Sequence, residues 1–156
     1  MKTIDARSEK NIATLTPEAK EKAMEWLAKV REKGINAVII QGTRTWQEQD
    51  ELYAQGRTEK GPKVTNARGG YSVHNYGMAW DFVVFEDVSD NGGVGHALWD
   101  SPKMEEAGKI GESIGLEWGG SWKGFRDIPH LQMPGLDINA LRAMMPRGWR
   151  PRPGIV

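Results

Sequence analysis

The sequence predicts a single α+β domain from its length, its composition and its mixture of helical segments with short apolar runs. A chain of 156 residues is the usual size of one domain and can bury about two thirds of the surface it exposes when unfolded. Hydrophobic residues make up 38% and charged residues 27%, which is typical of a globular protein. Helices mixed with short strands in one small chain favour the α+β class.

Helices are predicted where apolar residues recur at helical spacing between residues that favour helix ends. The first covers residues 17–33, because Thr16 can cap its start, Pro17 suits its first turn and Gly34 suits its end. The other helices are expected at 45–55, 102–114 and 136–144.

Short apolar runs predict the strands. Residues 37–40 form a β-branched run that is typical of a buried strand, and residues 79–85 form a second apolar run. Residues 116–118 and 130–133 are shorter candidates. Side chains alternate along a strand, so Asp81 is expected on the same face as Ala79.

Charge and cysteine content exclude several classes of protein. The 21 basic and 21 acidic residues cancel, which argues against nucleic-acid binding, because phosphate neutralisation needs a basic surplus. No cysteine is present, so disulfides, thiolate nucleophiles and cysteine-ligated zinc are excluded. Residues 1–15 lack the apolar core of a secretory signal, and no apolar run is long enough to span a membrane. We therefore expect synthesis in the cytoplasm.

Two short clusters hold two of the three histidines, each close to a carboxylate: His74 with Asp81, and His130 with Asp127. A catalytic zinc needs three protein ligands and an open position, which His74, Asp81 and His130 could supply without cysteine. Asp127 could then act as the base for a metal-bound water. The alternative also stands at this point: each histidine could be structural, Asp81 could pair with an arginine, and Asp127 could be a turn residue.

Two spaced patterns resemble a known peptidase family. They are S-x-H-x-x-G-x-A-x-D at residues 72–81 and D-x-x-H at residues 127–130. Together they resemble the zinc peptidases of the D-alanyl-D-alanine carboxypeptidase group, and within it the L-alanyl-D-glutamate endopeptidases of bacteriophage endolysins. The resemblance also covers residues 8–15, 42–45 and 117–122. It implies a short antiparallel sheet with flanking helices and a zinc site, the fold of LAS-type and Hedgehog-like peptidases.

The resemblance implies a role for each matching residue. The implied Zn²⁺ ligands are His74, Asp81 and His130. Asp127 would be the general base and acid. Arg44 would face the substrate, where a guanidinium could bind a peptide carboxylate, and Ser72 would hydrogen-bond the substrate or orient the site. Trp118 and Trp122 are further candidates for substrate binding, because their rings offer rigid contact surfaces, but they could equally belong to the core.

The function implied by the resemblance is a peptidoglycan-degrading endolysin that cuts the L-alanyl-D-glutamate bond of stem peptides and lyses the host. Residues 1–145 would form the catalytic domain and residues 146–156 a basic tail rich in proline and arginine. We expect a monomer that reaches the cell wall through a holin-type release factor. The alternatives are a D,D-carboxypeptidase or dipeptidase acting on terminal D-alanine, and a non-catalytic zinc-containing wall-binding module.

Overall fold

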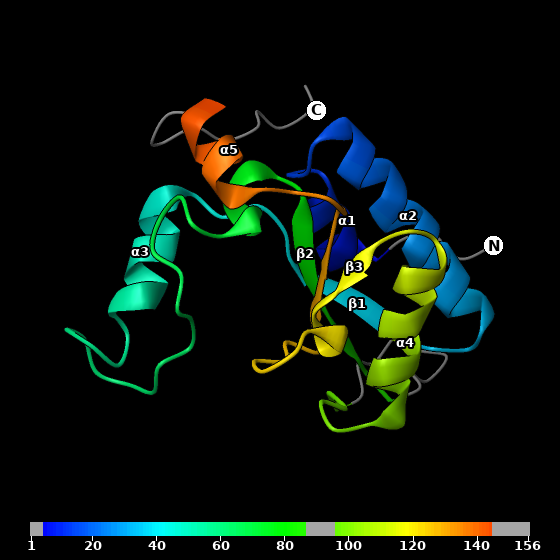
Figure 1. Ribbon diagram of the computed structural model, residues 1–156. Helices are drawn as coiled ribbons and strands as arrows, with labels where there is room; N and C mark the ends of the chain where they lie inside the picture. Colours follow the sequence, from blue (N-terminus) through cyan, green and yellow to red (C-terminus); the bar gives the residue numbers. More distant parts are fainter. Residues whose placement is uncertain (1–4, 87–95, 145–156) are drawn as a thin grey trace.

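A four-stranded antiparallel sheet organises the described residues, 5–86 and 96–144, of the computed structural model (Figure 1). The strands lie in the order β1, β2, β4, β3. Their bounds are β1 Ala37–Gln41, β2 Ala79–Val84, β3 Glu117–Trp118 and β4 His130–Gln132. The predicted α+β class and small antiparallel sheet are therefore confirmed.

Helices lie on both sides of this sheet in the described part of the chain. The α-helices are α1 Ala6–Ile12, α2 Pro17–Glu32, α3 Trp46–Ala54, α4 Pro102–Ser113 and α5 Ile138–Met144. Two short 3₁₀ helices are η1 Val73–Tyr76 and η2 Gly119–Ser121. Figure 1 shows α2 and α4 on one side of the sheet, with α3 and α5 on the other. No helix in the described ranges has the length and apolar character needed to cross a membrane.

The main core lies between the sheet and helices α2 and α4. Trp80 of β2 and Leu131 of β4 are register partners and point into this core. Trp26 of α2 packs on the same layer, with its ring centre 6.4 Å from that of Trp80. Its indole N–H also donates to the Ala107 carbonyl at 2.9 Å, which joins α2 to α4. One face of the sheet is therefore apolar and fully covered.

The opposite face of β2 and β4 carries polar side chains. Asp81 pairs in register with His130, and Ala79 pairs with Gln132. Glu117 of β3 pairs with Gln132 from the other side. Because side chains alternate along a strand, these residues share the face turned away from the main core. The sheet thus places a row of chemically active side chains opposite its apolar layer.

Helix α1 is an element that the sequence reading missed. Its seven residues, ARSEKNI, show no apolar periodicity. The helix packs against the edge strand β1, and two of its side chains hydrogen-bond to the backbone of that strand. Ser8 Oγ accepts from the Ile39 amide at 3.0 Å, and Asn11 Nδ2 donates to the Ile39 carbonyl at 2.9 Å. These contacts satisfy backbone groups that an edge strand would leave open. The predicted tail, 146–156, lies outside the described residues.

Candidate metal centre and active site

His74 is held by the short helix η1. The Ser72 side chain caps this helix by accepting a hydrogen bond from the His74 amide at 3.2 Å. Gly77 ends it with a φ of 73°, a left-handed conformation that glycine adopts without strain. The His74 side chain is buried, and its Nδ1 lies 2.9 Å from the Gly42 carbonyl. This local structure explains the serine and glycine of the motif.

Asn75 fixes η1 to the segment that follows β1. Its side chain is fully buried, and its Oδ1 accepts from two backbone amides of its own loop. Its Nδ2 donates to the carbonyls of Arg44 and Thr45 at 3.1 and 3.2 Å. All of its amide hydrogen-bonding groups are in use, so Asn75 holds His74 and Arg44 in a fixed relation.

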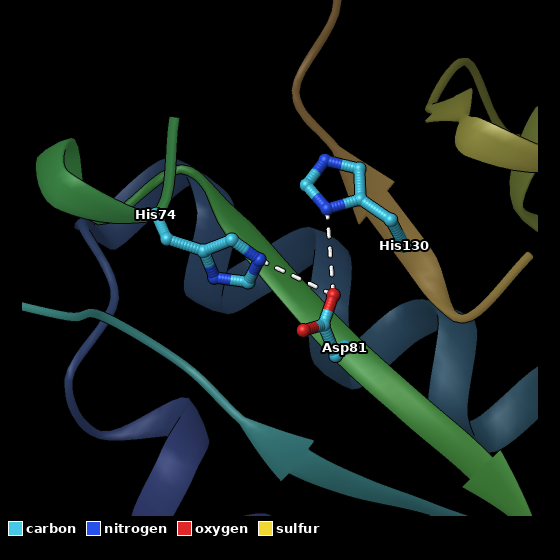
Figure 2. A group of neighbouring side chains, drawn as sticks. All are labelled: His74, Asp81 and His130. Carbon is cyan, nitrogen blue, oxygen red and sulfur yellow. Dashed lines mark hydrogen bonds and ion pairs between the residues drawn. The ribbon is translucent and has the colours of Figure 1, made fainter. Parts of the chain in front are cut away.

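His74, Asp81 and His130 converge on one point (Figure 2). His74 Nε2 lies 3.2 Å from Asp81 Oδ1, and His130 Nδ1 lies 3.4 Å from the same oxygen. One ligand atom from each residue falls within 4.8 Å of the others. Ligands of a tetrahedral zinc with bonds of 2.0–2.1 Å lie about 3.3 Å apart, so the spacing fits.

The protonation of His74 also favours a cation at this point. The Gly42 carbonyl can only accept a hydrogen bond, so His74 Nδ1 carries the proton that points at it. In the neutral ring, the lone pair of His74 Nε2 then faces a carboxylate oxygen of Asp81. Two acceptors at this distance repel each other unless a cation lies between them. The donor set, imidazole and carboxylate, is one that zinc accepts.

Arg44 holds the second oxygen of Asp81. Its Nη2 donates to Asp81 Oδ2 at 3.0 Å, while its Nη1 donates to Gln49 Oε1 at 3.1 Å. Gln49 is itself buried and donates to the Ala67 carbonyl at 2.8 Å. Arg44 therefore leaves only Asp81 Oδ1 directed at the two histidines. A substrate contact for Arg44 stays a prediction.

Asp127 lies beside this cluster at the end of the loop before β4. Its Oδ2 is 4.0 Å from His130 Nδ1, and its side chain is 41% exposed. The loop is fixed by backbone hydrogen bonds from Asp127 to Gly119 and from His130 to Asp127, at 2.9 and 3.1 Å. Asp127 is thus a carboxylate next to the candidate metal ligands that keeps contact with solvent.

Burial and charge shift the titration of these groups in opposite directions. Burial acts to raise the pKa of Asp81, but the charges and hydrogen bonds that His74 and His130 supply when their rings are protonated outweigh it and hold that pKa far below its usual range. Burial lowers the pKa of His74. For His130, burial acts to lower the pKa, but the hydrogen bond and charge of Asp81 raise it overall. The cluster is therefore built around an ionised Asp81.

Burial raises the pKa of Asp127, and the negative charge of Asp81 raises it further. A carboxylate with a raised pKa is a better proton acceptor than an ordinary surface aspartate. This environment suits the base predicted at this position.

The position of Trp118 does not agree with its predicted role in substrate binding. Its side chain is only 3% exposed and belongs to the main core, where its indole N–H donates to the Ile128 carbonyl at 2.8 Å. It therefore offers no surface to a substrate. Trp122 lies on the site face instead, with its ring centre 5.1 Å from that of His130. Strand alternation after Glu117 decides this, and aromatic character alone could not reveal it.

Sequence reasoning also missed Gln132, Glu117 and Gln49. Gln132 could have been found, because it stands two residues after His130 in a predicted strand and so shares its face. Gln49 and Glu117 are brought to the site by packing between distant segments, for which the sequence carried no signal.

The fold and this arrangement of histidines and carboxylates define a class of metal-dependent hydrolase. Comparison with known proteins agrees: a family model for D-alanyl-D-alanine carboxypeptidase matches residues 65–133. The peptidoglycan L-alanyl-D-glutamate endopeptidase CwlK of Bacillus subtilis is 44% identical over 128 residues, which cover 76% of this chain and 73% of that protein. The chain therefore belongs to the D-alanyl-D-alanine carboxypeptidase family of peptidases, of which CwlK is a relative.

Two further relatives differ more. The L-alanyl-D-glutamate peptidase of Listeria phage A118 is 31% identical over 127 residues, covering 81% of this chain and 41% of the phage protein. The crystal structure of the L-Ala D-Glu endopeptidase ChiX from Serratia marcescens matches with a TM-score of 0.60. That match covers 82% of this chain and 86% of the other at 23% identity, so it supports the fold.

Proposed function

We propose that this peptidase is a zinc-dependent endopeptidase that hydrolyses the L-alanyl-D-glutamate bond of peptidoglycan stem peptides. The observation that carries the proposal is the convergence of His74 and His130 on one oxygen of Asp81, with Asp127 beside them. The names of the Bacillus and Listeria phage relatives both state this bond, and the former shares 44% of aligned residues with the chain.

In this proposal His74, Asp81 and His130 would hold Zn²⁺. When bound, zinc polarises the scissile carbonyl and makes a water molecule a better nucleophile. Asp127 takes the proton from the attacking water with a carboxylate oxygen and delivers it to the amino group of the departing D-glutamate. Arg44 holds Asp81 in a fixed orientation through its hydrogen bond to Oδ2.

Two substrate contacts remain proposals. Arg44 is partly exposed and could receive a substrate carboxylate while it holds Asp81. Ser72 is committed to capping η1, so we propose that it orients His74 and contacts the substrate only secondarily.

We further propose that the chain is a phage-type endolysin. The relative from Listeria phage A118 supports this role. A monomeric catalytic domain over residues 1–145 would act on the cell wall after a holin-type factor opens the membrane, with host lysis as the result. Residues 146–156 would be a basic tail outside that domain.

The description of the matching family favours one other function, a D,D-carboxypeptidase or dipeptidase that removes terminal D-alanine. It would use the same metal ligands and the same base. A non-catalytic zinc module is the third possibility, and the partly exposed Asp127 argues against it, because a structural site needs no base.

The test is mass spectrometry of purified peptidoglycan digested by the protein, with a chelated and zinc-restored sample as control. The proposal predicts new N-terminal D-glutamate and L-alanine left on the muramic acid. Loss of terminal D-alanine alone would assign the protein as a carboxypeptidase. Zinc binding without any cleavage would overturn the assignment as an enzyme of the wall.

A further inference from the structure

A row of hydrogen-bonded side chains runs across the site face from His130 to β3. His130 Nε2 lies 2.7 Å from Gln132 Oε1, and Gln132 Nε2 donates to Glu117 Oε2 at 3.2 Å. Trp122 Nε1 donates to the same oxygen at 3.1 Å. The row follows from the sheet, because Glu117 and Gln132 are register partners and Gln132 is two residues from His130.

The hydrogen bonds at Glu117, the end of the row farthest from His130, determine where each proton of the row lies. An indole N–H can only donate, so Trp122 donates to Glu117 Oε2, and Gln132 Nε2 donates to the same oxygen. The amide nitrogen of Gln132 is then directed at Glu117, and its oxygen faces His130. That oxygen can only accept, so His130 Nε2 carries a proton. In the neutral ring, which is the form that binds a metal, the lone pair therefore lies on Nδ1, the nitrogen nearest Asp81.

We propose that Gln132 and Glu117 are positioning residues that fix His130 in the tautomer that binds the metal through Nδ1. This inference rests on the zinc site of the proposed function and adds the residues that orient one of its ligands. Trp122 contributes twice, as a donor to Glu117 and as a ring packed beside the His130 imidazole at 46°.

The burial of His130 and Gln132 makes the hydrogen bond between them important for the choice of tautomer. His130 is 5% exposed and Gln132 is 7% exposed, so water has little access to replace a lost hydrogen bond. A ring free to adopt the other tautomer would turn an N–H toward the metal position and lose its ligand there. The hydrogen-bond partners of metal-bound histidines typically change metal affinity by about 10–100-fold when they are removed.

The first test is Gln132→Met, which keeps the length of the side chain and removes its hydrogen bonds. Zinc affinity, measured by competition with a chromophoric chelator, should fall by about 10–100-fold. The matched control is Gln47→Met at an exposed helical position, which should leave the affinity unchanged. In zinc-loaded protein, the ¹⁵N spectrum of the wild-type His130 ring should show a protonated Nε2 and a metal-bound Nδ1.

A swap of the two polar groups separates positioning from simple packing. Gln132→Glu combined with Glu117→Gln keeps every hydrogen bond of the row and reverses only the one between positions 132 and 117: the new carboxylate accepts from His130 and from the new amide, whose oxygen accepts from Trp122. This double variant should recover most of the zinc affinity that Gln132→Met loses. Gln132→Glu alone sets two carboxylates against each other and should recover less.

Zinc affinity equal to wild type in Gln132→Met would overturn the inference, as would a double variant no better than Gln132→Met. If Gln132→Met fails to fold by circular dichroism, Glu117→Leu tests the same row from its partly exposed end and should also weaken zinc binding. Wild-type protein that binds no zinc would instead overturn the proposed function itself, so the two failures can be told apart.

Discussion

Asp81 shows how a single carboxylate can contact two histidines and an arginine at the same time. Its Oδ1 faces both histidines, while its Oδ2 is held by Arg44 at 3.0 Å. The guanidinium balances the negative charge and prevents the carboxylate from rotating. A ligand fixed in this way loses little conformational entropy when a metal binds, which favours a preorganised site.

Asp127 has a role that mutation can separate from metal binding. Asp127→Ala should keep the fold and bound zinc but lower the rate of stem-peptide hydrolysis by about 10²–10⁴-fold, because the general base is lost. Zinc content by mass spectrometry and hydrolysis rate are the two measurements. His130→Ala is the contrasting variant, since it should lose metal affinity first. Full hydrolysis by zinc-loaded Asp127→Ala would remove Asp127 from the mechanism.

Arg44 can be assigned by comparing its effects on metal and substrate. Arg44→Met should weaken zinc binding by about 10–100-fold, because Asp81 loses the partner that orients it. Chelator competition measures this affinity, and kinetics at saturating zinc measure KM. A raised KM with unchanged zinc affinity would contradict a positioning role and assign Arg44 to substrate binding.

The sequence predicted the candidate ligands because their spacing is local, but it could not predict their partners. His74 and Asp81 stand seven residues apart, and the turn between them is marked by Gly77. Arg44 and Asp81 are separated by 37 positions and meet only through packing. Trp118 was misjudged for a similar reason, because the side of the sheet that it faces depends on its register with Leu131.

At the scale of elements, α4 packs close to the sheet because two of its positions lack a side chain. A Cβ built on Gly108 would lie 2.1 Å from the Trp118 indole, and one on Gly111 would lie 2.6 Å from Leu131. The indole is rigid and enclosed in the core, so it cannot move away easily. These glycines let α4 support the strands that carry Glu117 and His130.

Gly108→Ala should therefore destabilise the protein by about 1–3 kcal/mol through overpacking. Urea unfolding followed by circular dichroism, with a chelator present, measures the change in the free energy of unfolding. Glu106→Ala, on an exposed position of the same helix, is the control and should change little. Equal stability of Gly108→Ala and wild type would contradict the close packing of α4.

Asp5 links α1 to α2 and gives this contact a pH dependence. Burial acts to raise the pKa of Asp5, but hydrogen bonds from Ser8 and the Arg31 guanidinium outweigh it and lower the pKa overall. A pKa that is lower in the folded state contributes stability above its unfolded value, which is lost as pH falls through the folded value. The Tm of wild type should thus drop more steeply below about pH 4 than that of Asp5→Asn. Parallel curves for the two proteins would contradict this.

Over the whole molecule, the order of the strands creates the site. Strand β4 lies between β2 and β3, so residues from 74–81 and from 117–132 meet on one face although they are far apart in the sequence. The sequence predicted most elements, because caps, glycines and apolar periodicity are local signals. It missed α1 and did not predict the strand order, since both depend on contacts between distant segments.

One face of the sheet forms the core, and the other carries the candidate metal ligands. One face is sealed by α2 and α4 around Trp26, Trp80 and Leu131, and the other presents the histidines and carboxylates. A smaller cluster of Trp46, Tyr76 and Leu141 joins η1 to α3 and α5. The segment with His74 is therefore anchored on both sides, which keeps the candidate metal centre rigid.

The most direct test of the central claim is hydrolysis of a synthetic stem peptide by chelated protein as zinc is added back. The account predicts that cleavage between L-alanine and D-glutamate rises in proportion to zinc and stops rising at one ion per chain, and that His74→Ala shows neither binding nor cleavage. Full activity in the chelated protein, or saturating zinc with no cleavage at this bond, would contradict the account.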